Sequence, residues 1–164
     1  MCKTVSNRPT AKKAEEALRQ SQQEFISIFR DNPEAIVYVN KKGDILDINL
    51  RFSKLFGYSL KEIKGKNINS GIIHPPDKIE EGEGLDNKAI SKGYVNFETI
   101  RKKKNGTLFP VSLSGSPVIV DGKSRRIIGM FVDITERKKL KSSSRKVLRN
   151  CKRLWKIVSR LFPW

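Results

Sequence analysis

The sequence is poor in the residues from which catalytic and metal sites are most often built. It contains one histidine, His74, so a cluster of histidines for catalysis or metal binding is excluded. Its two cysteines, Cys2 and Cys151, lie near opposite ends and form neither a CxxC motif nor a metal-ligand spacing. We therefore expect no catalytic residues, no metal ligands and no enzymatic activity.

Long apolar runs are also missing. No segment approaches the roughly 18 apolar residues of a membrane-spanning helix, and the first 20 residues lack the apolar region of a secretory signal. Together with the unpaired thiols, this predicts a cytoplasmic protein. The 164 residues suffice for one domain with flanking segments.

Acidic residues are scarce, with 17 Asp and Glu against 34 Lys and Arg. The excess is uneven, because residues 135–164 carry a net charge of +10 out of the total of +17. Such asymmetry indicates a basic tail with an anionic partner rather than a uniformly basic domain.

Residues 9–30 have the spacing of an amphipathic helix. Small and apolar residues recur every three or four positions, at Ala14, Leu18, Ser21, Phe25 and Ile28. The stripe is typical of a short coiled coil, although one helix packing on its own domain would show the same pattern.

The middle of the chain reads as a hairpin, short helices and a meander. Strands over 35–40 and 45–50 flank a glycine turn. Asn49 can cap the next helix, and Ser59 with Glu62 forms a capping box. We predict a loop over 69–84 and a helix over 85–92. Three strands follow, reversed at Asn105-Gly106 and Asp121-Gly122, so the fold class is α+β with an antiparallel sheet.

Five pieces in this order resemble a PAS sensory domain of the bacterial and archaeal type: DNPEAIVYVNKKGDILDIN, LFGYSLKEIKGK, IHPPDK, KKNGTLFPVSLSGSPV and IIGMFVDITERKK. The resemblance implies a five-stranded antiparallel sheet in the order 2-1-5-4-3, helices on one face, and signalling through helices at both ends. We accordingly divide the chain into an N-terminal helical linker (1–20), the PAS domain (21–139) and a basic amphipathic C-terminal helix (140–164).

The resemblance also marks a junction and argues against two cofactors. Asp133, Ile134 and Thr135 join the last strand to the exit helix, where short oxygen-bearing side chains can cap the helix. Haem-binding relatives place their ligand on the helix that corresponds to 85–92, which has no histidine here. Flavin photoreceptors need a cysteine where this chain has Ile68. We expect neither haem nor flavin, and the cofactor, if any, stays unidentified.

Sheet alternation predicts a pocket. Two glycines, Gly115 and Gly129, would leave room beside the sheet. The residues expected around it are Val37, Val39, Phe52, Leu55, Val111, Leu113, Gly129 and Phe131. The same residues would equally fill a core without a ligand.

The tail has a clean apolar face opposite a basic one. Seven cations between Arg145 and Arg160 face away from the apolar side, and no acid accompanies them. Such a helix suits an anionic membrane surface or a partner's groove, which would place the protein at the membrane periphery. The residues assigned to this contact are Leu148, Lys152, Leu154, Trp155, Val158, Leu161 and Phe162. A dimerising exit helix and a segment without function are the alternatives.

These patterns predict a non-enzymatic sensor or interaction module that relays the state of a ligand or partner through its terminal helices. We expect a homodimer or a complex with another PAS or kinase protein, with a small molecule as the ligand. A fragment or partner of a histidine kinase or transcription regulator is an alternative. A nucleic-acid binder is disfavoured because no reading motif is present.

Overall fold

The strands form one antiparallel sheet in the order β2-β1-β5-β4-β3, as the resemblance implies. The computed structural model describes residues 8–120 and 123–161. In chain order the elements are α1 (Arg8–Asp31), β1 (Ala35–Asn40), β2 (Ile45–Ile48), α2 (Leu50–Phe56), α3 (Leu60–Ile63), the 3-10 helix η1 (Pro76–Lys78), α4 (Ile79–Lys92), β3 (Val95–Lys102), β4 (Leu108–Val120), β5 (Lys123–Asp133) and α5 (Thr135–Leu161).

Local signals set the short helices. The Asn49 side chain accepts the N–H of Phe52 at 2.9 Å and caps α2, and Gly57 ends that helix with a positive φ of 83°. Ser59 and Glu62 form the predicted capping box of α3. The predicted turn at Asp121-Gly122 lies outside the described residues.

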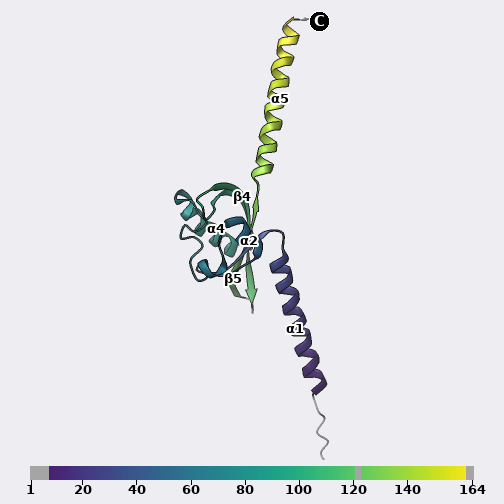
Figure 1. Ribbon diagram of the computed structural model, residues 1–164, viewed down its shortest axis with the longest axis vertical. Coiled ribbons are helices and arrows are strands. Elements are labelled where there is room, and N and C mark those ends of the chain that lie inside the picture. The colour runs from purple at the N-terminus through teal and green to yellow at the C-terminus, as the bar shows by residue number, and fades with distance from the viewer. Residues whose placement is uncertain (1–7, 121–122, 162–164) are drawn as a thin grey trace, which may run out of the picture.

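The short helices and α4 cover one face of the sheet, whereas α1 and α5 leave the domain in opposite directions (Figure 1). The core lies between the sheet and the short helices. Phe52 and Phe56 from α2 meet Phe131 of β5 edge-on, with ring centroids 5.9 and 5.2 Å apart. These rings hold α2 against the sheet.

The loop predicted over 69–84 is wrong in its second half, because α4 begins at Ile79 rather than near Leu85. Gly82 and Gly84 lie inside the helix although glycine favours loops in isolation. Tertiary contacts override that preference: Gly82 is buried against Asn69 and His74, and Glu81 is bound to β3.

Candidate functional site

A cavity of about 40 Å³ lies between the sheet and α4. Five of the eight residues predicted for a pocket line it, namely Val37, Val39, Leu113, Gly129 and Phe131. Pockets for cofactor-sized ligands have roughly 300–1,000 Å³. A cavity of this size fits only a molecule of a few atoms.

The other three predicted residues lie elsewhere. Phe52 and Val111 are fully buried in the core cluster, and Leu55 packs against that cluster without reaching the cavity. At α2 the phenyl rings of Phe52 and Phe56 pack on each other and on the sheet, so this part is a filled core, the alternative that the sequence left open. The cavity is displaced from α2 toward α4.

The cavity floor is a row of four residues across the sheet. Val37 pairs with Gly129, Gly129 with Gly115, and Gly115 with Val95. A Cβ at Gly129 would lie 3.2 Å from Val37 Cγ1, and one at Gly115 would lie 3.0 Å from Val95 Cγ1. Side chains at the two central positions would crowd their neighbours, and the glycines avoid this.

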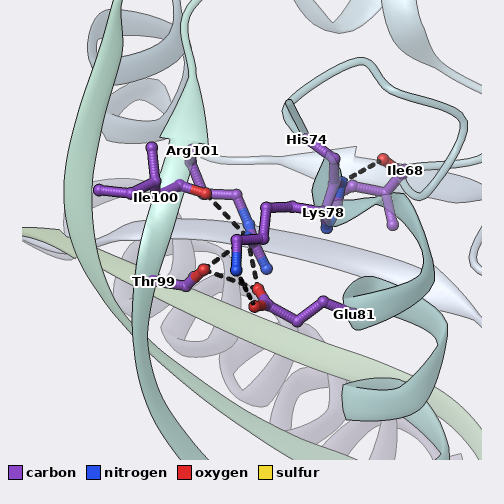
Figure 2. A network of polar contacts seen from close by, with 7 residues as sticks. All are labelled: Ile68, His74, Lys78, Glu81, Thr99, Ile100 and Arg101. Carbon is purple, nitrogen blue, oxygen red and sulfur yellow. Dashed lines mark hydrogen bonds and ion pairs between the residues drawn. The ribbon is translucent and has the colours of Figure 1, made fainter. Parts of the chain in front are cut away.

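One end of the cavity is polar and centres on Arg101 of β3, whose side chain is 0% exposed. Its Nη1 donates to Glu81 Oε1 of α4 at 2.9 Å, to the Ile100 carbonyl at 3.0 Å and to Thr99 Oγ1 at 3.2 Å. Thr99 in turn donates to Glu81 Oε1 at 2.7 Å, and Lys78 lies 3.4 Å from Glu81 Oε2. Figure 2 shows Arg101 reaching from the strand toward Glu81.

Burial and pairing compete at this ion pair. Burial lowers the pKa of Arg101, and the hydrogen bond and charge of Glu81 oppose that shift. Burial raises the pKa of Glu81, but hydrogen bonds from Thr99 and Arg101 outweigh it and hold that pKa below its usual value. An arginine keeps its proton in proteins, and the lowered pKa of Glu81 favours its carboxylate form, so the two groups form an ion pair.

Sequence reasoning missed Arg101, although a signal was present. The Asn105-Gly106 turn predicts a hairpin, and its register pairs Arg101 with Phe109. Strand alternation puts Phe109 on the same face as Val111 and Leu113, which were expected beside the pocket, and residues paired across two strands share a face. Arg101 therefore had to point toward the core, where a charged residue needs a partner.

His74 and Asn69 complete the polar end. His74 is buried, and its Nδ1 donates to the Ile68 carbonyl at 3.1 Å. Burial, with the nearby charge of Arg101, lowers the pKa of His74 to about 4, so the ring is neutral at pH 7. Asn69 Nδ2 donates to Asp86 Oδ2 at 2.7 Å, and burial raises the pKa of that carboxyl group. Within the described ranges no three His, Cys, Asp or Glu residues are placed to hold a metal ion.

The predicted junction joins β5 to α5 in three residues. Asp133 Oδ1 accepts the N–H of Thr135, the first residue of α5, at 2.9 Å. Ile134 is buried, and its N–H donates to the Pro110 carbonyl of β4 at 3.0 Å. Glu98 of β3 accepts a hydrogen bond from Arg137 in the first turn of α5. The start of the helix is thus attached to the sheet at several points.

The tail continues α5 without a break to Leu161. Leu148, Lys152 and Trp155 are exposed, Trp155 at 70%. Nothing is described of the side chains of Leu154, Val158 and Leu161, and Phe162 lies outside the described residues. No described helix is long and apolar enough to cross a membrane.

A sequence model of the PAS domain family matches residues 33–136. A probable serine/threonine-protein kinase of Dictyostelium discoideum is 28% identical over 116 residues, which cover 66% of this chain. The match spans only 7% of the length of that kinase.

Solved structures share the fold. The PAS domain of an HTR-like protein from Haloarcula marismortui aligns with a TM-score of 0.62 and 20% identity, covering 75% of this chain and 99% of that domain. The PAS domain of a LuxR-family transcriptional regulator from Burkholderia thailandensis, in complex with ethanol, aligns with a TM-score of 0.56 and 20% identity, covering 67% and 96%.

Proposed function

The chain belongs to the PAS domain family of signalling and sensor modules, and we propose that it is a non-enzymatic member that relays ligand or partner state through its terminal helices. The match to a kinase covers 7% of that protein, which is too little to carry kinase activity to this chain. We infer that any catalytic output belongs to a partner, such as a kinase or a transcription regulator.

The observation that carries this proposal is the course of β5. Ile127, Gly129 and Phe131 of that strand line the cavity, and α5 begins four residues after Phe131. A molecule that presses on Phe131 or Gly129 acts on the strand that leads into the exit helix. The ethanol complex of the LuxR-family PAS domain supports a small molecule as the ligand.

The junction tests the relay. Replacing Asp133 and Thr135 by alanine removes the contact to the Thr135 N–H, at a cost of about 1 kcal/mol for a lost helix cap. We expect faster amide exchange in the first turns of α5 and unchanged exchange in the sheet, measured by mass spectrometry.

Alanine at Ser143 and Ser144, further along the same helix, is the matched control and should leave the first turn unchanged. If the junction variant exchanges like the wild type after residue 135, the proposed relay has no physical basis.

We infer that the partner of α1 is a second copy of the chain. The stripe predicted on this helix is uncovered, with Leu18 60% and Phe25 61% exposed, and Ile28 exposed beside them. A 24-residue helix with an open apolar stripe gains stability by pairing with a like helix. Family members commonly dimerise, which supports this choice.

Glutamate at both Leu18 and Phe25 should therefore shift the native mass from dimer to monomer at tens of micromolar. The Gln20→Glu, Gln23→Glu variant adds the same charge on the polar face of α1 and should stay dimeric. A wild-type protein that is monomeric at that concentration would contradict the inference.

A second candidate function rests on the tail. Exposed Leu148 and Trp155 share α5 with seven cations, and we propose that this face binds an anionic membrane surface. Each cation near such a surface contributes about 1 kcal/mol.

The full chain should therefore co-sediment with vesicles containing phosphatidylserine and much less with neutral ones, and high salt should weaken the binding. Alanine at Leu148 and Trp155 should remove most of it. Alanine at Leu108 and Ile119, two exposed apolar residues of β4, should not. Equal binding of the two double variants would contradict the membrane role.

A further inference from the structure

Two nitrogen atoms of Arg101, which together carry three N–H groups, donate no hydrogen bond to the described residues. Its Nη1 makes all the contacts given above, and neither Nε nor Nη2 has a partner among residues 8–120 and 123–161, although both atoms are buried. Nε and Nη2 lie on the same edge of the guanidinium group, and their N–H bonds point the same way. A buried donor without an acceptor lowers the stability of the fold. An oxygen atom from outside the chain that accepts from this edge would remove that cost.

The cavity beside Arg101 limits what can supply that oxygen. Its volume of about 40 Å³ holds roughly three water-sized groups. Away from the polar end, the lining is apolar and includes Leu85, Leu113 and Phe131. The space suits a molecule of about three or four non-hydrogen atoms with one oxygen-bearing end.

The charges around the cavity argue against an anion. Glu81 already neutralises Arg101 at 2.9 Å, and the carboxyl group of Asp86 is among the residues that line the cavity. His74 donates through Nδ1 to a carbonyl that can only accept, so its Nε2 carries a lone pair rather than a proton. A further negative charge here would be buried without a counterion, which is strongly unfavourable.

We propose that the cavity binds a small uncharged molecule of the amide, ketone or alcohol class, whose oxygen accepts from Nε and Nη2 of Arg101. The apolar part of the ligand lies against Leu113 and Phe131. This rests on the proposed sensing function and names its ligand class.

Acetamide and acetate test the class, because they have the same size and shape and differ in charge. Nitrogen-15 NMR of the full chain reports directly on the Arg101 Nε–H. We expect acetamide to shift that resonance with an affinity of about millimolar, as befits so small a ligand, and sodium acetate to shift it no more than sodium chloride does. Saturable binding of acetate in preference to acetamide overturns the proposal, and so does saturation by neither.

Two variants locate the site. Arg101→Lys keeps the charge and removes the paired donors, and should weaken acetamide binding about tenfold or more. Arg126→Lys, at an exposed arginine of β5, is the control. Ala89→Leu replaces a methyl group of the lining by a larger apolar side chain and leaves Arg101 unchanged, and should abolish binding even if the Arg101 variant folds poorly. Binding that survives Ala89→Leu overturns the assignment.

The proposed relay to α5 has a test that does not depend on the ligand class. Exchange in α5 measured with and without acetamide tests the sensing function, and acetate binding would refute the ligand class while leaving that function intact.

Discussion

The Glu81→Gln variant is expected to unfold with a free energy about 3 kcal/mol lower than that of the wild type. Glutamine keeps the oxygen that accepts from Arg101 Nη1 and removes only the charge. Arg101 is completely buried, so the variant leaves a cation in the core without its counterion. Breaking a buried ion pair from one side typically costs about 3–5 kcal/mol. We place this pair at the lower end because the Glu81 side chain is 19% exposed.

Two controls test whether the loss of stability comes from the burial of the Arg101 charge rather than from the loss of any ion pair. Glu62→Gln removes the charge of an exposed pair with Lys104 but keeps an oxygen for the capping box of α3. It should change stability little because solvent screens such pairs. Combining Glu81→Leu with Arg101→Met removes both charges at once and should restore most of the loss. Urea unfolding of the three variants measures all of these differences. If Glu81→Gln is no worse than Glu62→Gln, the pair behaves as a surface contact.

The second large effect is a contrast between two glycines of α4. A Cβ at Gly82 would lie 2.3 Å from Asn69 Oδ1 and 2.6 Å from His74 Nε2, so both side chains must move. Both are buried and hydrogen-bonded, to Asp86 and to the Ile68 carbonyl. Gly82→Ala should therefore cost about 1–3 kcal/mol.

Gly84 supplies the matched control two residues away. A Cβ there meets no atom within 4 Å, so Gly84→Ala should stabilise the helix by about 0.5–1 kcal/mol. We expect thermal unfolding to separate the two variants by about 1.5–4 kcal/mol. Equal stability of the two variants would show that α4 can move away from Asn69 and His74 at little cost.

The predicted pocket residues show what strand alternation can predict and what it cannot. Alternation placed Val37, Leu113, Gly129 and Phe131 on one face, and all four line the cavity. It could not distinguish them from Val111, which faces the same way and is covered by the core. Whether an inward residue meets a cavity or a phenyl ring depends on the helix above it, and alternation within a strand carries no information on that helix.

The sequence by itself determined the features that depend on neighbours along the chain. The Asn49 cap, the Ser59–Glu62 capping box and the Asn105-Gly106 turn each form within a few residues, so propensity and spacing are sufficient to predict them. Their order, through the resemblance to PAS domains, also predicted the sheet.

Only the tertiary structure decided where α4 begins, where the cavity lies and which groups the Arg101 side chain contacts. Glu81 and Arg101 are 20 residues apart, and Asn69 and Asp86 are 17 apart. Such contacts form only after α4 packs on the sheet, and their energies are large enough to override the local preference of two glycines for a loop. The cavity is the space left when Phe52 and Phe56 fill one end of the core and the polar groups occupy the other. Its size and charge follow from packing between elements that are distant in the chain.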